Sequence, residues 1–512
     1  MKTTKIYGPP GTGKTTYLLA TLKRLLDAGY HPSQVAYLSH SKAAAEEVAD
    51  RITQQYASLN MQKDFPWFRT IHSACCRRLG IGRREIMSGG DYQEFSQKYG
   101  WPLKGIIDDL SENTDIGNYD LIINARSLAS HWKLSMPETL ARLAPNPIYR
   151  NWDVFLDDFH AYKFAEGKVD FVDMLEQGKA LGPIPDVKVY IIDEGQDLSE
   201  LQLDLIRNWS QDADEVYIAG DDDQAIYTFL GSSENGFLRY KADETIVLDK
   251  SYRCPQKVGR LAEHIINRVK DRQVKDVAWR PCKGTVLRTV TWRMLPWRDA
   301  MKSGSVMVLC RHRKQAYSVG WHLLELDVPC TILGRPLINE KLSDLVRTYF
   351  RLRRGLQVAA PDVANLLTHL GDTNGSRAVR ALASRDHTCL LSGSDTMIDL
   401  HDPNWVSRMA AGNDRNYKDL KRISRLISIY GVDILDKKPN IEVTTYHQSK
   451  GREADTVILL TDCYRNTWEE QAVRPATETR LCYVGATRAR DKLVICSPET
   501  DMYMRPLLEV IC

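Results

Sequence analysis

Short apolar runs alternate along the first part of the chain with segments in which apolar residues recur every three or four positions. Residues 5–7 and 34–38 are runs of the first kind, whereas residues 17–26 repeat leucine at helical spacing. A short apolar run predicts a buried strand, and the longer repeat predicts an amphipathic helix. Strands that alternate with helices form parallel sheets. The sequence therefore predicts that the chain begins with an α/β domain.

The alternation of predicted strands and helices is then interrupted, and it returns later in the chain. Between about residues 80 and 168 the sequence is helical in period and rich in aromatic residues, which predicts a helical subdomain inserted into the α/β domain. We expect its aromatic side chains to form a core, and contacts with nucleic-acid bases are the alternative. Further apolar runs occupy residues 187–192, 215–219, 305–310, 455–460 and 492–496. The last three of these runs predict a second α/β sheet.

A glycine-rich loop joins the first predicted strand to the first predicted helix. Its two glycines followed by Lys14 and Thr15 have the spacing of a phosphate-binding loop. Backbone N–H groups of such a loop and the N-terminus of the next helix attract nucleotide phosphates. We expect Lys14 to contact the β- and γ-phosphates of ATP and the Thr15 hydroxyl to bind Mg²⁺. A glycine turn beside an unrelated lysine is the alternative. The loop consists of Gly8, Pro9, Pro10, Gly11, Thr12, Gly13, Lys14, Thr15 and Thr16.

Carboxylates follow the predicted strand at residues 187–192. Acidic groups at the end of a buried strand are costly unless a function requires them. We expect Asp193 to hold Mg²⁺ and Glu194 to polarise the attacking water of a nucleotide hydrolase. The alternative is a polar cluster that caps the helix predicted near residue 201.

A second polar segment follows the predicted strand at residues 215–219. Gln224 stands at the end of that strand, where a side-chain amide can sense the γ-phosphate. Tyr227 and Phe229 are spaced to lie on one side and to stack on bases. Such an arrangement would couple the state of ATP to contact with a nucleic-acid strand.

Composition narrows the class of protein. A chain of 512 residues is too long for one ordinary core, so we expect two or more domains. The net charge of +3 does not by itself indicate a nucleic-acid binder. No apolar run reaches the roughly 18 residues of a membrane helix, and the opening strand leaves no place for a signal peptide. The 11 cysteines are scattered without a CxxC pair, which predicts reduced thiols. We expect a cytoplasmic protein without a membrane partner, in the host cytoplasm if the source is viral.

In their order along the chain, these motifs resemble those of the superfamily 1A DNA helicases of the UvrD/Rep/PcrA family, in a compact form. The phosphate loop matches the first motif of that family, and residues 193–197 match its DExQD box. Residues 220–227 are similar to its GDxxQxIY segment. Further matches occupy residues 41–44, 70–73, 251–253, 443–453 and 478–490.

The resemblance implies roles for residues in the second half of the chain. Tyr252 would stack on adenine, Arg253 would meet the γ-phosphate, and Glu453 would approach the ribose. Arg488 is the arginine of the last motif. An arginine alone is more often a surface ion-pair partner. Only the motif context assigns Arg253 and Arg488 to stabilising charge on a transferring phosphoryl group. The expected catalytic residues are Lys14, Glu194, Gln224, Arg253 and Arg488. The expected DNA contacts are Ser41, Thr70, His72, Tyr227, Phe229, Thr445 and His447.

The resemblance also implies an architecture. The fold class is α/β, with two RecA-like parallel-sheet motor domains of the P-loop NTPase type, each interrupted by a mostly helical inserted subdomain. Residues 371–376 in the second insert are rich in Gly, Ser and Asp, which predicts turns. The expected boundaries are 1–80 and 168–247 for the first motor domain, 81–167 for its insert, 248–354 and 439–512 for the second motor domain, and 355–438 for its reduced insert.

The implied function is that of an ATP-dependent DNA helicase. It would use ATP and Mg²⁺, move 3′ to 5′ on single-stranded DNA, and unwind duplex at junctions of single- and double-stranded DNA, with replication or repair proteins as partners. The alternatives are a translocase that displaces bound proteins, a DNA-sensing ATPase subunit of an effector complex, and a motor on RNA. Only seven residues precede Gly8, where the family usually has a glutamine that reads adenine, so selectivity for ATP over other nucleoside triphosphates is not predicted.

Overall fold

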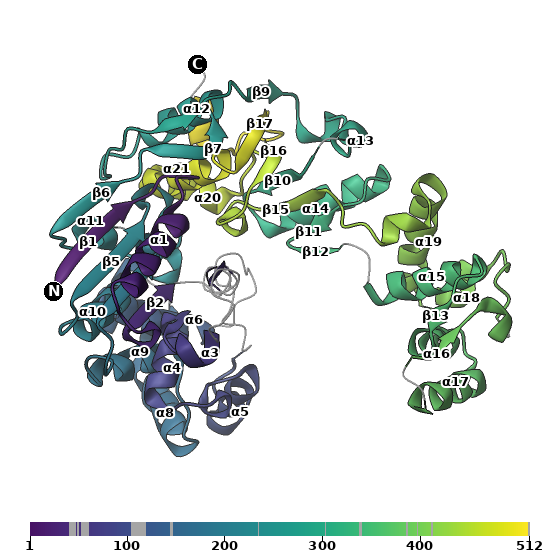
Figure 1. Cartoon of the computed structure of the whole chain (residues 1–512), viewed down its shortest axis with the longest axis horizontal. Helices are drawn as coiled ribbons and strands as arrows, with labels where there is room; N and C mark the ends of the chain where they lie inside the picture. Colours follow the sequence, from purple (N-terminus) through teal and green to yellow (C-terminus); the bar gives the residue numbers. More distant parts are fainter. Residues whose placement is uncertain are drawn as a thin grey trace.

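The computed structural model contains two large sheets, and we call the parts of the chain that form them the first and second motor domains (Figure 1). The ten cysteines among the described residues are free thiols, as expected. No helix in the described part of the chain is long and apolar enough to cross a membrane. The structure describes residues 1–39, 48, 51–52, 61–103, 119–143, 147–233, 235–302, 304–336, 340–385, 388–396, 398–410 and 413–509.

Six parallel strands form the sheet of the first motor domain. They are β1 (Lys2–Tyr7), β2 (Val35–Ser39), β3 (Phe68–Thr70), β4 (Val189–Asp193), β5 (Glu215–Gly220) and β6 (Glu244–Val247). Their order across the sheet is β3-β2-β4-β5-β1-β6. The associated helices are α1 (Lys14–Asp27), α3 (Met61–Asp64), α4 (Ile71–Leu79), α9 (Phe171–Ala180), α10 (Glu200–Trp209) and α11 (Gly236–Arg239).

Helices cover both faces of this first sheet. In β2, Val35 and Tyr37 share a core with α1, whereas Ala36 and Leu38 share a core with α4, α9 and α10. All five residues of β2 are buried. Strands buried on both faces read as continuous apolar runs, which is why the sequence pattern shows them clearly.

A helical subdomain is inserted between α4 and α9. Its helices are α5 (Gly89–Tyr99), α6 (Asp120–Trp132), α7 (Met136–Arg142) and α8 (Trp152–Ala165), and the described residues between 80 and 168 contain no named strand. Phe155, Phe159 and Tyr162 are fully buried in a core of its own, with Trp101 and Trp152 packed against them. The prediction of an aromatic core is confirmed for these residues.

Seven strands form the sheet of the second motor domain. They are β9 (Thr285–Thr289), β10 (Val306–Cys310), β11 (Thr331–Ile332), β12 (Arg335–Pro336), β15 (Ile441–Thr445), β16 (Ala454–Leu459) and β17 (Ala489–Cys496). Their order is β12-β11-β15-β10-β16-β17-β9, and all neighbours are parallel except β11 and β12. A separate parallel pair consists of β7 (Lys250–Pro255) and β8 (Ala278–Arg280).

Helices also cover both faces of the second sheet. In β10, Leu309 packs toward α12 (Gln256–Ile266) and α21 (Pro475–Ala486), while Val308 packs toward α14 (Arg313–Glu325). The remaining helices of this domain are α13 (Trp297–Ala300), α20 (Arg465–Val473) and α22 (Arg505–Leu508). The prediction of two parallel-sheet motor domains is confirmed.

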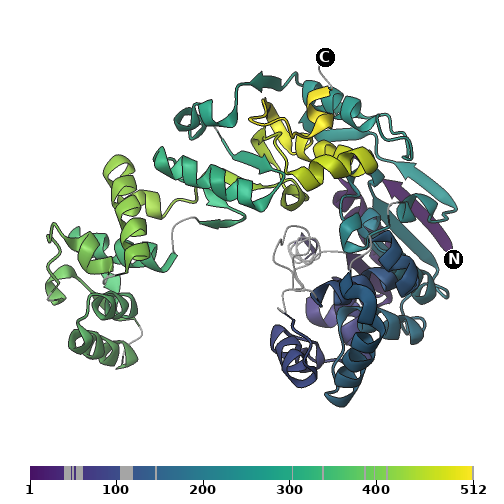
Figure 2. The same ribbon diagram turned by 180° about the vertical axis from the view of Figure 1, so that it is seen from behind.

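The second insert has a hydrophobic core of its own and stands apart from both large sheets, as the two opposite views show (Figures 1 and 2). It contains α15 (Glu340–Arg353), β13 (Val358–Ala359), α16 (Ala360–His369), α17 (Thr373–Arg385), β14 (Leu390–Leu391), α18 (Trp405–Ala410) and α19 (Asp414–Tyr430). Leu342 and Val346 of α15 belong to this core. We therefore propose that the insert begins near residue 340.

The prediction that residues 371–376 form only turns is wrong, because α17 begins at Thr373. The physical reason is a side-chain cap. Asp372 accepts a hydrogen bond from the backbone N–H of Gly375 at 2.9 Å. An aspartate at this position satisfies an N–H group of the first helical turn, so the polar cluster starts a helix.

Candidate functional site

Three neighbouring strands of the first sheet end at one edge, and a sequence motif follows each. β1, β5 and β4 are adjacent and end at Tyr7, Gly220 and Asp193. Because these strands are parallel, the segments that follow them meet at the carboxyl edge of the sheet. The N–H of Gly8 donates to the carbonyl of Gly220 at 2.9 Å and joins two of the segments directly.

The phosphate loop requires glycine at two positions. Gly13 precedes α1 with φ of 80°, a left-handed conformation that glycine adopts without strain. A Cβ at Gly8 would lie 2.0 Å from the Cγ of Lys14, so only glycine leaves room for the lysine stem. The Lys14 ammonium donates to the Gly8 carbonyl at 2.9 Å. The lysine therefore folds back over the loop.

The second motor domain reaches this loop through β7. The N–H of Tyr252 donates to the carbonyl of Gly11 at 2.8 Å. Tyr252 is 65% exposed. Next to it, Arg253 Nε lies 2.5 Å from Glu453 Oε2. The structure thus brings the three predicted nucleotide contacts of the second half to the phosphate loop.

A cavity of about 490 Å³ lies between the two motor domains at the phosphate loop. Among the described residues, seven cationic side chains and only two carboxylates line it. This excess of positive charge attracts polyanions, and the volume is that of a ligand pocket. Its charged residues are Lys14, Arg51, Glu194, Arg253, Arg280, Lys450, Glu453, Arg488 and Arg490. Its other lining residues include Pro9, Pro10, Gly11, Thr12, Gly13, Thr15, Thr16, Gln224 and Tyr252.

The two carboxylates after β4 differ in their electrostatic environment. Asp193 is 2% exposed, and its oxygens accept from the Tyr37 hydroxyl and the Glu194 N–H, each at 2.8 Å. Burial, followed by the charge of Glu194, raises the pKa of Asp193. Burial also acts on Glu194, but Lys14 and Lys450 outweigh it and lower the pKa of that carboxyl. An ionised Glu194 therefore lines the cavity.

Oxygen ligands suited to Mg²⁺ are available at the same edge. Thr15 lines the cavity at the start of α1, and Asp193 ends β4. A hydroxyl and a carboxylate are ligands that Mg²⁺ prefers, and each Asp193 oxygen has a second lone pair beyond its present hydrogen bond. Ser199 caps α10, so the alternative of a helix-capping cluster holds for its serine, whereas Asp193 and Glu194 do not cap that helix.

Gln224 and Arg488 meet across the two motor domains. Arg488 Nη2 donates to Gln224 Oε1 at 3.0 Å. Arg488 is 1% exposed, and burial, followed by the charge of Arg253, lowers its pKa to about 9. At neutral pH the guanidinium is still charged. A buried positive charge therefore reaches the cavity beside a neutral amide.

A buried ion pair that sequence analysis did not assign also crosses between the motor domains. Lys450 Nζ lies 2.5 and 2.6 Å from the two carboxylate oxygens of Asp197 and donates to the Gln224 carbonyl at 2.8 Å. Both partners lie inside matched motifs, and that is the signal by which they could have been found. Removing one partner of such a pair leaves an uncompensated buried charge.

Three predicted DNA contacts gather where the motor domains meet. The rings of Phe229 and His447 lie edge to face with centroids 5.2 Å apart, and the Tyr227 ring lies 6.3 Å from that of Phe229. Tyr227 Oη donates to the His447 carbonyl at 3.3 Å. Lys450 Nζ lies 5.1 Å from the centroid of the Tyr227 ring. Lys450 thus contacts this aromatic group and lines the cavity.

The other predicted DNA contacts are not gathered in this group. Thr70 caps α4 by accepting a backbone N–H of the same helix at 3.3 Å. The His72 ring lies edge to face with Phe171, with centroids 5.3 Å apart. Thr445 ends β15 and is only 3% exposed. Ser41 lies outside the described residues.

Family models match both halves of the chain. The UvrD/REP helicase N-terminal domain matches residues 1–245, and the UvrD-like helicase C-terminal domain matches residues 405–500. Together they cover about two thirds of the chain, including the phosphate loop, Glu194 and Arg488. The chain belongs to the UvrD-like helicase family. The resemblance inferred from the motifs is thereby confirmed.

Curated relatives in the UvrD-like family are similar at low identity. The ATP-dependent DNA helicase PcrA of Leuconostoc citreum is 26% identical over 362 residues, which are 63% of this chain and 47% of that protein. The PcrA helicase of Bacillus subtilis is 24% identical over 291 residues, 52% of this chain and 38% of that protein. A probable DNA helicase II homologue of Mycoplasma capricolum is 23% identical over 311 residues, 54% of this chain and 40% of that protein. The matched regions thus span less than half the length of these relatives.

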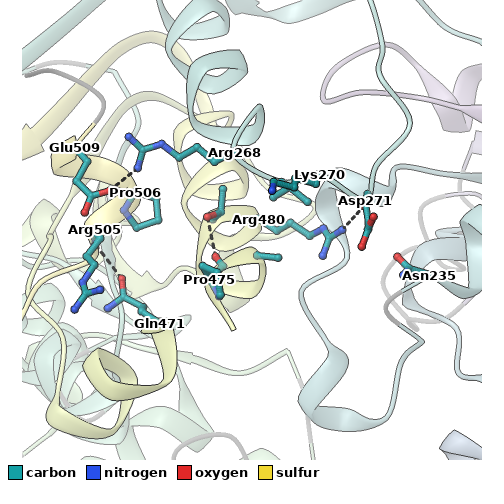
Figure 3. Close-up of a pocket in the computed structure, with 13 residues that line it drawn as sticks. Asn235, Arg268, Lys270, Asp271, Gln471, Pro475, Arg480, Arg505, Pro506 and Glu509 are labelled. Atoms are coloured by element: carbon teal, nitrogen blue, oxygen red, sulfur yellow. Dashed lines mark hydrogen bonds and ion pairs between the residues drawn. The ribbon is translucent and has the colours of Figure 1, made fainter. Parts of the chain in front are cut away.

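This UvrD-like chain has a second cavity, of about 480 Å³, between the end of α12 and the helices α20, α21 and α22 (Figure 3). It shares no lining residue with the cavity at the phosphate loop. Arg268 forms an ion pair with Glu509 at 2.9 Å, and Arg480 donates to the carbonyl of Asp271 at 3.1 Å. Both contacts lie within the second motor domain, and we assign the second cavity no part in the candidate site.

Proposed function

We propose that the chain is an ATP-dependent DNA helicase, whose ATPase activity is stimulated by single-stranded DNA. The observation that carries this proposal is the strongly cationic cavity that both motor domains line. A polyanion bound there contacts both domains at once, so its binding and loss change how the domains are held together. The family match supports the proposal, as do the relatives that are named as DNA helicases.

In the proposed ATP site, the loop residues Gly8 to Thr16 surround the phosphates and Lys14 contacts the β- and γ-phosphates. Glu194 is ionised, so it accepts a hydrogen bond from the attacking water and can take its proton. Thr15 and Asp193 would hold Mg²⁺, which neutralises phosphate charge when it is bound.

The second motor domain supplies the remaining groups of the proposed site. Arg253 and Arg488 stabilise the charge that develops on the transferred phosphoryl group. The contact with Glu453 uses Arg253 Nε, so the Nη groups of Arg253 are the donors that we propose for a phosphate, and Glu453 beside them is proposed to approach the ribose hydroxyls. The exposed ring of Tyr252 offers a face to the adenine base.

We place single-stranded DNA over the aromatic group formed by Tyr227, Phe229 and His447. Burial lowers the pKa of His447 well below its ordinary value, so its ring is neutral and suited to stacking. Lys450 would carry changes at the cavity to this group, because it contacts both Tyr227 and Gln224. Ser41, Thr70, His72 and Thr445 stay predictions as DNA contacts, as do 3′ to 5′ movement, replication or repair partners and a cytoplasmic location.

The domain boundaries belong to the same proposal. Motor domain one comprises 1–80 and 168–247, with its insert at 81–167, and motor domain two comprises 248 to about 339 and 439–512. In this arrangement the cavity lies between the two motor domains, and phosphate-loop residues and Arg488 line it together.

The first test is ATP hydrolysis with and without single-stranded DNA, for the wild-type chain and for Glu194→Gln. We expect DNA to stimulate the wild type and Glu194→Gln to lower kcat by roughly 100-fold or more, because the general base is lost. Binding of a fluorescent ATP analogue should be retained in that variant. Stimulation should weaken between roughly 50 and 200 mM salt, because phosphate contacts release counterions.

Different outcomes separate the proposal from its rivals. ATP hydrolysis that DNA does not stimulate contradicts a DNA-driven motor. Stimulation without strand separation, measured with a forked duplex that carries a fluorophore and a quencher, indicates a translocase that displaces proteins. Activity that appears only in a complex with another protein indicates a sensing subunit.

A further inference from the structure

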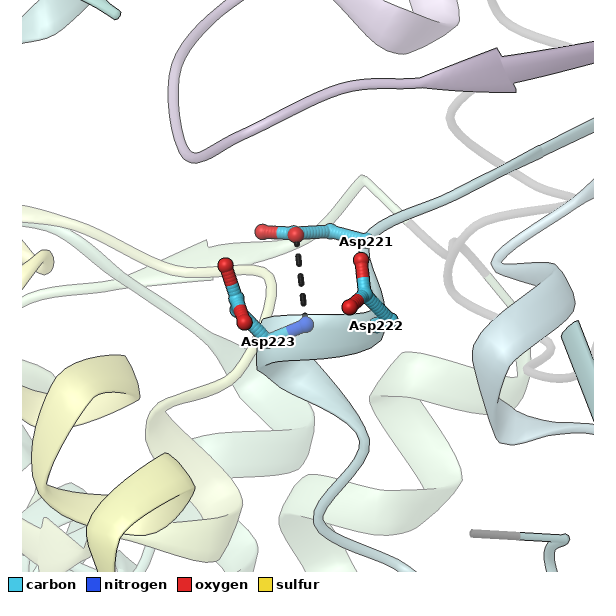
Figure 4. A group of neighbouring side chains, drawn as sticks. All are labelled: Asp221, Asp222 and Asp223. Carbon is cyan, nitrogen blue, oxygen red and sulfur yellow. Dashed lines mark hydrogen bonds between the residues drawn. The ribbon is translucent and has the colours of Figure 1, made fainter. Parts of the chain in front are cut away.

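Three consecutive aspartates follow β5, and their carboxylates surround a lysine ammonium. Figure 4 shows Asp221, Asp222 and Asp223, which each offer an oxygen within 4.8 Å of the others. Lys275 Nζ lies 2.7, 2.5 and 2.9 Å from these three carboxylates in turn. The side chain of Lys275 is 1% exposed. The ammonium thus takes the central position that a metal ion would require.

Lys275 belongs to the second motor domain, whereas the aspartates belong to the first. It lies in residues 268–277, between α12 and β8, and Val269 at the start of this segment is buried in the core of the second motor domain. Arg480 of α21 holds the same segment through the Asp271 carbonyl (Figure 3). The lysine is therefore anchored to one motor domain and buried among carboxylates of the other.

Asp221 connects this lysine to the candidate catalytic residues. One of its oxygens accepts from Lys275 and the other accepts from Gln224 Nε2 at 2.7 Å. Its backbone N–H donates to Gln196 Oε1 at 2.9 Å, and Gln196 Nε2 donates to Glu194 Oε2 at 2.5 Å. The carboxylate that Lys275 holds thus orients the amide of Gln224, whereas the link to Glu194 runs through the backbone N–H of Asp221.

Arg272 binds the same cluster but has a different partner. Its Nε and Nη2 each lie 2.7 Å from a carboxylate oxygen of Asp223. Among the described hydrogen bonds, the Asp223 carboxylate makes none with Gln224 or Gln196, and only the backbone N–H of Asp223 reaches Asp221 Oδ1, at 3.3 Å. The two cations therefore make similar buried ion pairs across the motor domains, and only Lys275 reaches Asp221.

We propose that Lys275 is a positioning residue for ATP hydrolysis, which acts by holding Asp221 and through it the Gln224 amide at the phosphate site. This inference rests on the proposed function. Its consequence is that the second motor domain controls hydrolysis from a place outside the cavity. Loss of the ammonium leaves neighbouring buried carboxylates that repel one another, so Asp221 moves and Gln224 loses its orientation.

The test compares Lys275→Met with Arg272→Met in the full chain. We expect Lys275→Met to lower the kcat of DNA-stimulated ATP hydrolysis by roughly 10- to 100-fold, the size of effect that a small misplacement produces. The KM for ATP should change by less than about threefold, because phosphate binding residues are untouched. Arg272→Met should lower kcat by less than about threefold, because its partner does not contact Gln224.

A double-mutant cycle with Gln224→Ala tests whether Lys275 affects hydrolysis through Gln224. If Lys275 acts through Gln224, adding Lys275→Met to Gln224→Ala should lower kcat by less than about twofold further. A purely structural role would reduce kcat by the same factor in both backgrounds. That result would overturn the inference, as would equal losses for Lys275→Met and Arg272→Met.

Folding is checked by circular dichroism and by binding of the fluorescent ATP analogue. If Lys275→Met does not fold, Lys275→Arg replaces it in the cycle, because the larger planar group keeps the charge but changes the hydrogen-bond geometry. We expect the same non-additivity with Gln224→Ala, and full additivity overturns the inference.

A wild-type chain that hydrolyses no ATP contradicts the proposed function and this inference together. An active wild type with additive variants contradicts the inference alone.

Discussion

Glu194 adopts a left-handed backbone conformation with φ of 54°, which is uncommon for a residue other than glycine. It directly follows β4, and its N–H donates to Asp193 Oδ1. The turn places Glu194 at the cavity while Asp193 stays buried behind it. Such a conformation costs on the order of 1–3 kcal/mol and persists where the surrounding structure holds it. The strain separates the two carboxylates into different environments.

His312 provides a prediction on stability and pH. Its ring stacks on Tyr464 with centroids 4.3 Å apart, and its Nε2 accepts the Tyr464 N–H at 3.2 Å. Burial, followed by the charge of Arg311, lowers the pKa of His312 to about 3. Below about pH 6.5 the unfolded chain therefore binds a proton that the folded chain does not, and stability falls as the pH decreases toward 3.

We expect His312→Gln to reduce this acid sensitivity. The loss in free energy of unfolding between about pH 7.5 and pH 5.0 should be smaller than in the wild type by about 1–2 kcal/mol. Urea denaturation at the two pH values measures it. His264→Gln, at an exposed position, is the control and should leave the difference unchanged. An equal loss in wild type and His312→Gln would show that the ring is protonated in the folded chain.

At the scale of elements, the phosphate loop and β7 form a contact between the two motor domains. Ser251 Oγ donates to the Pro10 carbonyl at 2.7 Å. A Cβ at Gly11 would lie 2.4 Å from the Cβ of Arg253. Gly11 therefore serves two purposes, since it has φ of 73° and also lets the strand approach. The glycine spacing of the loop predicts the first purpose but not the second.

Gly11→Ala tests this contact. We expect ATP affinity to fall by roughly tenfold or more, because β7 and Arg253 are displaced from the loop. Fluorescence titration with an ATP analogue measures the change. Gly29→Ala is the matched control, because Gly29 has φ of 98° but nothing within 4 Å of an added Cβ. Both variants strain the backbone by about 1–2 kcal/mol, so equal ATP affinities would contradict a role for the contact.

At the scale of the whole molecule, the second insert is a unit attached at a small contact. Its α19 reaches the second motor domain where Tyr430 Oη donates to the Asp327 carbonyl at 2.8 Å and Arg425 Nε lies 2.6 Å from Asp327 Oδ1. Its core shares no residue with the cores of the two large sheets. The apolar packing of the insert is therefore separate from that of either sheet.

We expect a fragment of residues 340–436 to fold on its own. Circular dichroism should show helix and a cooperative thermal transition, because α15 through α19 enclose a continuous apolar core. Val346 is fully buried there, so Val346→Asp should abolish the transition at a cost of several kcal/mol. A fragment without cooperative unfolding would show that the insert depends on the motor domains.

Much of the candidate site could be predicted from local sequence rules. The glycine spacing before Lys14 indicates a phosphate loop, and the carboxylates after an apolar run indicate a hydrolase strand end, because both patterns stand between a predicted strand and a predicted helix. The turns expected at residues 371–376 show the limit of these rules, because the side chain of Asp372 converts a polar cluster into a helix start. The residue at which a helix begins depends on such single hydrogen bonds, whereas the existence of a strongly periodic helix or strand does not.

By itself, the sequence determined the individual strands of the two sheets and the motifs predicted to bind phosphate, because each depends on neighbours within a few positions. Only the tertiary structure decided which charged side chains pair with one another. Lys450 meets Asp197 across 253 positions, and Lys275 meets Asp221 across 54. A chain with 69 basic and 66 acidic residues allows very many such pairs. Packing of the two motor domains selects among them, since it determines which opposite charges are buried together.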